Sequence, residues 1–142
     1  MTIRPCTDCL DLPSGPMCRG ADGERDFARL AHGYLKHDHL DAVPHTSAFD
    51  CVFGLECDEP EEALIFLFAA HALVANEEER AYLAAGPLER LLVRHGPLVV
   101  DRIVEKARQE PLFRRCLSGV WGRDDMAPEV AARIDAILKP VE

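Results

Sequence analysis

Cysteines near the N-terminus are the residues whose spacing most directly suggests chemistry. Cys6 and Cys9 are separated by two residues, and Cys18 follows across a segment rich in proline and glycine. Two thiolates at this spacing can bind one tetrahedral Zn²⁺, and a third thiol can add a ligand. His32, His37, His39 and Cys51 are candidates for the missing ligand. The sequence therefore leaves two alternatives, a zinc site and reduced thiols that bind no metal.

An enzymatic use of these residues has little local support. A thioredoxin-like Cys-x-x-Cys opens a helix after a strand, and the pattern here predicts neither. The segment His37 to Asp41 superficially resembles the HxHxD motif of metallo-β-lactamase-like hydrolases, but Ala42 follows where a histidine is needed. We predict no catalytic residues, and a metal-dependent enzyme is the alternative to a non-enzymatic protein.

The charge is distributed unevenly along the chain. The net charge is -9, and residues 1–79 hold 16 acidic and 5 basic side chains, whereas residues 80–142 hold 9 acidic and 11 basic ones. Residues 37–79 contain 11 Asp and Glu and no Lys or Arg. Because phosphate binding depends on lysine and arginine, nucleic acid is not the expected main partner.

This acidic span predicts a surface that binds a basic protein partner. Carboxylates at helix N-termini stabilise the helix, but some acids here fall in predicted loops or at helix C-termini, where the helix dipole disfavours them. We therefore expect a binding module of the immunity-protein or phage-inhibitor type. The alternative is an ordinary solvated surface. The candidate contact residues are Asp38, Asp41, Asp50, Glu56, Asp58 and Glu59.

The elements that would position these residues are all predicted to be helices. Apolar residues recur at helical spacing, and prolines at five predicted helix starts follow plausible breaks. We expect one all-α domain of six to eight short antiparallel helices over residues 24–142, an irregular HEAT- or armadillo-like stack or bundle, after an irregular cysteine-rich leader over 1–23. The predicted helix starts are Pro60, Pro87, Pro97, Pro111 and Pro128.

Several local signals refine this expectation. Asn76 with Glu79, and Asp58 with Glu61, have the spacing of capping boxes, which begin helices. Gly96-Pro97 predicts a break between two helices. The predicted shared core consists of Phe66, Leu88, Leu92, Ile103, Phe113, Leu117 and Trp121.

The compartment follows from features that the chain lacks. The N-terminus has no basic start followed by an apolar run, and no apolar stretch approaches the roughly 20 residues that span a bilayer. We expect a cytoplasmic protein without a membrane segment, and six cysteines that are reduced there.

Several short motifs, finally, are similar to those of a known group of sequences. They are Asp58-Glu-Pro-Glu-Glu-Ala63, Leu83-Ala-Ala-Gly-Pro-Leu-Glu89, Arg94-His-Gly96, Ala107-Arg108, and Phe113-Arg114 through Leu117, Gly119, Val120 and Trp121. Over about residues 49–122 the chain resembles an uncharacterised bacterial family of small helical proteins of unknown function (DUF6869-like). The resemblance implies a bacterial or phage origin and an all-helical fold, and it implies no activity.

Overall fold

The computed structural model describes residues 26–35 and 47–139, and all regular elements in these ranges are helical. The predicted all-α class is therefore confirmed. The leader over residues 1–23 lies outside the described ranges. The elements are α1 (Phe27–Gly33), α2 (Ser47–Asp58), α3 (Pro60–Ala72), α4 (Glu77–Leu83), the π-helix η2 (Ala84–Leu88), α5 (Glu89–Gln109), α6 (Pro111–Leu117), the 3₁₀-helix η3 (Arg123–Asp125) and α7 (Pro128–Leu138).

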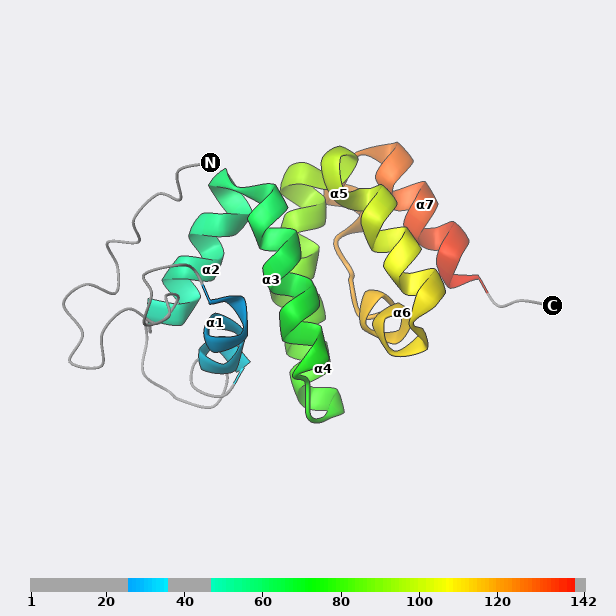
Figure 1. Ribbon diagram of the computed structural model, residues 1–142. Coiled ribbons are helices and arrows are strands. Elements are labelled where there is room, and N and C mark those ends of the chain that lie inside the picture. The colour runs from blue at the N-terminus through cyan, green and yellow to red at the C-terminus, as the bar shows by residue number, and fades with distance from the viewer. Residues whose placement is uncertain (1–25, 36–46, 140–142) are drawn as a thin grey trace.

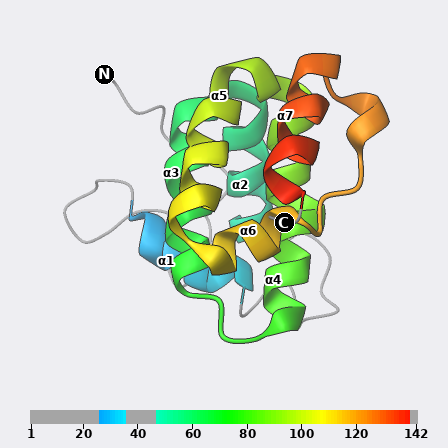
Figure 2. The ribbon, with the colours of Figure 1, turned by 90° about the vertical axis from the view of Figure 1, so that its right-hand side faces the viewer.

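The helices form one body around α3 and α5. In Figure 1, α1 and α2 lie on one side of α3, and α6 and α7 lie at the opposite side of the molecule. Direct packing joins α1 and α2 to α3, α3 to α5, and α5 to both α6 and α7. Figure 2 shows α7 beside α5, with the connection from α6 to α7 along the edge of the fold. The HEAT- or armadillo-like detail stays a prediction.

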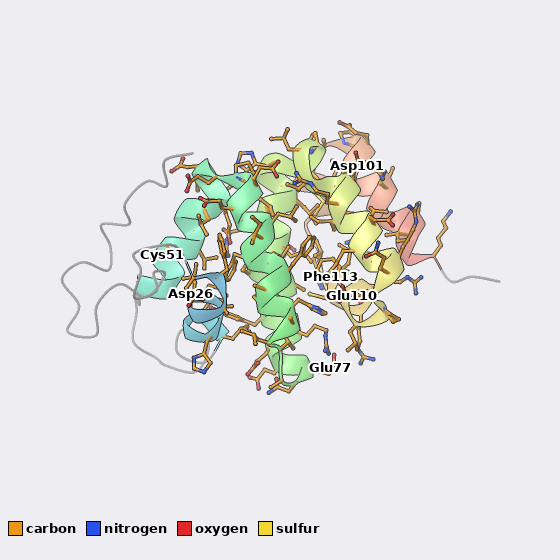
Figure 3. The ribbon with its side chains drawn as sticks, in the orientation of Figure 1. Asp26, Cys51, Glu77, Asp101, Glu110 and Phe113 are labelled. Atoms are coloured by element: carbon orange, nitrogen blue, oxygen red, sulfur yellow. The ribbon has the colours of Figure 1, made fainter. Side chains whose placement is uncertain are left out.

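One continuous hydrophobic core runs from α1 to α7, which makes the described part of the chain a single domain. Aromatic rings fill its centre: Tyr34 meets Phe66 edge-on at 5.8 Å between ring centroids, and Phe68 meets Phe113 at 5.4 Å. Figure 3 shows Phe113 at α6, in the interior. The predicted core residues Phe66, Leu88, Leu92, Ile103, Phe113 and Leu117 are all buried.

The seventh predicted core residue, Trp121, is a correction. Its side chain is 84% exposed. The prediction assumed that the helix from Pro111 continues to Trp121, but α6 ends at Leu117. Backbone bonds from Gly119 to Cys116 and from Val120 to Leu117 close a turn there, so the helical spacing that would bury the indole stops before it.

The five helix starts predicted at prolines differ in outcome. Pro60, Pro111 and Pro128 are the first residues of α3, α6 and α7, as predicted. Pro87, by contrast, lies inside the continuous helical chain of η2. The predicted break at Gly86-Pro87 is wrong because a π-helical turn carries α4 into α5. The predicted break at Gly96-Pro97 is confirmed: His95, at φ -134° and ψ 26°, is non-helical, and α5 consists of two helical segments joined across this kink, with Pro97 in the first turn of the second.

The two predicted caps also differ in outcome. Asn76 caps α4, accepting a bond from the Glu79 backbone N–H at 2.8 Å, and the Glu79 carboxylate accepts from Ala75 N–H at 3.0 Å. The predicted cap at Asp58 is wrong, because Asp58 is the last residue of α2 and Glu59 holds the N-cap position of α3 without a side-chain bond. Among the described helices, none is long and apolar enough to cross a membrane.

Candidate functional site

The predicted metal ligands cannot be compared with the structure. Cys6, Cys9, Cys18, His37 and His39 all lie outside the described residues. Within residues 26–35 and 47–139, no group of three or more His, Cys, Asp or Glu side chains is placed to hold a metal ion. The zinc site therefore stays a prediction.

The predicted acidic contact residues fall into three groups. Asp38 and Asp41 lie outside the described residues, and so does the side chain of Asp50. Asp58 and Glu59 lie at the junction of α2 and α3, where Asp58 is exposed and Glu59 is half-buried. Glu56 is a correction, because it is only 1% exposed and cannot present its charge to a partner.

Glu56 is buried because it pairs with an arginine from the second half of the chain. Arg90 donates from Nε to Glu56 Oε2 at 2.5 Å and from Nη2 to Oε1 at 3.0 Å. The same Nη2 also donates to the Tyr34 hydroxyl at 3.5 Å. Burial raises the pKa of the Glu56 carboxyl, and Arg90 and Arg94 oppose this rise. A carboxylate held on both oxygens by a guanidinium is a structural ion pair that joins α2 to α5, and the bond to Tyr34 adds the residue that follows α1.

Other acids of the first half find partners in the second half in the same way. Arg102 of α5 donates to both oxygens of Glu61 in α3, with the Nη2–Oε1 distance at 2.7 Å. Arg115 of α6 donates to Glu77 of α4 at 2.9 Å. Glu77 lies at the outer end of α4 in Figure 3. The charge asymmetry along the sequence is therefore partly cancelled in three dimensions.

Most basic side chains of the second half are engaged within the chain. Arg114 donates to the backbone carbonyls of Ile137 and Lys139 at the end of α7, at 3.0 Å each, and Arg94 lies over the Phe53 ring at 5.4 Å. An arginine already paired with a carboxylate adds no net positive charge to the surface. Ion pairs with carboxylates are made by Arg80, Arg90, Arg102, Lys106, Arg108, Arg115, Arg123 and Arg133.

The exposed indole of Trp121 lies on a turn whose backbone is fixed. The Glu89 Oε1 atom, at the start of α5, accepts the backbone N–H of Trp121 at 2.8 Å and that of Gly122 at 3.1 Å. A Cβ added at Gly122 would lie 3.3 Å from the Glu89 carboxyl carbon, so the close approach suits glycine. A bond from one carboxylate to two successive N–H groups holds the turn against α5.

A second set of bonds, to α7 and to the backbone of Val120, also holds this turn. Arg123 donates from Nε to Asp135 Oδ1 at 2.8 Å and from Nη1 to the Val120 carbonyl. Val120 itself is buried, and so is Met126 just after η3. The turn is thus anchored by apolar side chains at both ends and by polar bonds to α5 and α7.

Three carboxylates that form no ion pair with another described residue lie close together in this part of the sequence. Asp124 and Asp125, in η3, and Glu129, in the first turn of α7, are all exposed. None of these three side chains forms an ion pair with another described residue. This site was not predicted from the sequence, because the spacing of Trp121 indicated a core residue and the second half of the chain has a net positive charge.

Two buried groups in the core lack the properties of a catalyst. Burial raises the pKa of the Cys116 thiol to about 12, so little of the nucleophilic thiolate forms near neutral pH. Burial lowers the pKa of His71, whose ring meets Phe113 edge-on at 5.2 Å between centroids. Both side chains are packed in the core as structural groups.

Fold and site together define a small all-α protein with a braced surface turn that presents a tryptophan and unpaired carboxylates. The chain belongs to a family described as "Family of unknown function (DUF6869)", whose model matches residues 37–141. The match is longer than the predicted resemblance over 49–122, and it includes His37 and His39. No curated protein and no solved structure matches the chain.

Proposed function

We propose that the protein is a non-enzymatic binding module that inhibits or recruits a basic protein partner in the cytoplasm, as an immunity protein or a phage inhibitor does. The observation that carries this proposal is the internal use of the arginines. Because Arg90, Arg102 and Arg115 pair with acids of the first half, they cannot offset the remaining carboxylates. The remaining acids then account for the net charge of -9.

Such a surface attracts a basic partner over a distance and repels nucleic acid. Long-range attraction raises the association rate more than it raises the lifetime of the complex. It acts within a Debye length of about 8 Å at physiological salt, so it weakens as salt rises. Asp38, Asp41, Asp50, Asp58 and Glu59 remain the proposed steering residues, and Glu56 is no longer among them because it is buried.

The test has two stages. A pull-down from the native host first recovers basic proteins whose capture falls as salt rises. The association rate is then measured for the purified partner with the wild type and with Asp38→Lys combined with Asp41→Lys. We expect the charge reversal to slow association at low salt and to have less effect at high salt. The control for charge reversal outside the acidic span is Glu105→Lys, on the exposed face of α5.

Two results would contradict the proposal. One is the recovery of no basic partner at all. The other is an association rate that does not change with salt or with the charge reversal, while circular dichroism shows that the variant is folded. Loss of binding through unfolding is excluded by that same spectrum.

A further inference from the structure

The turn from Trp121 to Asp125 combines an exposed aromatic ring, a fixed backbone and unpaired carboxylates. An indole that is 84% exposed is unusual, since a folded chain normally buries most of such a ring. Other exposed apolar side chains, such as Leu98 at 61% and Leu112 at 57%, lie on helix surfaces and not on a braced turn. Trp121 is therefore the strongest candidate for a contact with another molecule.

The braces make this turn suited to binding. The bonds from Glu89 to the Trp121 and Gly122 N–H groups and from Arg123 to the Val120 carbonyl fix the backbone before any partner arrives. A surface that is already ordered loses less conformational entropy when it binds. Tryptophan is also enriched among the few residues that dominate the binding energy of protein interfaces. The turn thus has both an anchor residue and a rigid support.

The charges of the turn specify the chemistry of the ligand. The face of an indole attracts a cation within about 6 Å of its ring centre. Asp124 and Asp125 follow three and four residues after Trp121 and carry exposed carboxylates. The one cation within the turn, Arg123, is already paired with Asp135. The turn therefore offers an aromatic ring and negative charge together, which complements an arginine or lysine side chain.

We propose that residues 121–125 form a docking surface for a segment of a partner protein that carries arginine or lysine. The cationic side chain lies over the indole of Trp121 and is neutralised by Asp124 and Asp125. This inference rests on the proposed binding function and assigns its principal contact surface. The acids of the first half then affect the association rate, whereas Trp121 determines how long the complex lasts.

The single tryptophan allows a direct test on the full chain, because all indole emission comes from Trp121. The probe is a short synthetic peptide of alternating arginine and serine, and the matched control peptide carries neutral citrulline in place of arginine. We expect a saturable change in tryptophan emission with the arginine peptide and no change with the citrulline peptide. The anisotropy of a labelled arginine peptide measures its affinity for variants without the indole.

The variants separate the site from the rest of the surface. We expect Trp121→Ala to weaken binding about tenfold or more, the scale of an interface anchor. Asp124→Asn combined with Asp125→Asn weakens binding several-fold, and Leu98→Ala, an exposed apolar control, leaves it unchanged. Because the indole is exposed, Trp121→Ala should retain the melting temperature of the wild type.

Three outcomes overturn the inference. Undiminished binding of the arginine peptide to Trp121→Ala would place the site elsewhere while leaving the proposed function intact. Absence of binding to any variant or to the wild type would overturn the inference, and the separate pull-down would then decide the proposed function. A wild-type dimer that Trp121→Ala converts to a monomer in sedimentation would identify a second copy of the chain as the occupant.

Discussion

The ion pair between Glu56 and Arg90 should be a major contributor to stability, and Arg90→Ala tests this. The substitution leaves the Glu56 carboxyl in a site where it is only 1% exposed. Removing one partner of a buried ion pair typically costs about 3 to 5 kcal/mol. The Arg90 side chain is 28% exposed, so water already reaches part of the pair. We therefore expect a loss of about 2 to 3 kcal/mol in the free energy of unfolding at neutral pH.

The loss should depend on pH with a defined sign. Burial raises the pKa of Glu56 above its usual value, and without Arg90 less opposes this rise. The folded variant then holds a proton that the unfolded chain releases, so the variant loses stability as pH rises above the unfolded pKa of about 4.3. Urea unfolding followed by circular dichroism, at acidic and neutral pH, measures the difference. The deficit relative to wild type should be smallest at acidic pH.

A matched exposed pair provides the control for this prediction. Arg102 and Glu61 form a similar two-oxygen pair, but their side chains are 46% and 62% exposed. Exposed pairs contribute about 0 to 1 kcal/mol, so Arg102→Ala should have a small effect. Replacing both partners, Glu56→Leu with Arg90→Leu, should restore most of the stability. If Arg90→Ala cost no more than Arg102→Ala, the buried pair would not have the role assigned to it.

Further predictions concern the core and the helix contacts. Burial lowers the pKa of the His71 side chain in the folded protein. Its contribution to stability is therefore present above the pKa of histidine in the unfolded chain, about 6.5, and is lost as pH falls. We expect His71→Phe to flatten the dependence of the melting temperature on pH between about 7 and 5. Gly96→Ala would place a Cβ 2.9 Å from Val130 Cγ2 and should cost about 1 to 3 kcal/mol in denaturant unfolding, with recovery in combination with Val130→Ala. Gly54→Ala, which meets nothing within 4 Å in the middle of α2, should instead stabilise by about 0.5 to 1 kcal/mol. Cys116 should resist alkylation in the native protein at mildly alkaline pH and react after unfolding, as a mass measurement would show, because its thiol has a pKa of about 12. Equal rates of reaction in the two states would contradict the burial of this thiol.

Features that depend on neighbouring residues were predictable from the sequence. The cap of α4 is an example, because Asn76 and Glu79 are three residues apart and need only each other and the local backbone. The starts of α3 and α6 were predictable for the same reason, since proline favours the first turn of a helix. The interruption at Gly96-Pro97 was predictable in the same way, but these local signals do not show that the non-helical backbone lies at His95 or that the two helical segments stay joined across a kink.

The wrong assignments of Glu56 to the contact surface and of Trp121 to the core have causes in the tertiary structure. Glu56 looked like a surface acid because its partner, Arg90, lies 34 residues away in the sequence. Trp121 looked like core because it continues the spacing of Phe113 and Leu117, and nothing local shows that α6 ends at Leu117. The bond that holds the turn comes from Glu89, 32 residues before Trp121.

The position of the proposed docking surface follows from this pairing across the chain. The first half has the larger excess of acids, but Glu56, Glu61 and Glu77 each bind an arginine that folding brings from outside the acidic span. Arginines that made the second half look basic are used in these pairs, whereas Asp124 and Asp125 form no ion pair with another described residue. A basic partner would therefore meet the exposed carboxylates of Asp124 and Asp125 in the same turn as Trp121, in the half where the sequence alone showed a net positive charge.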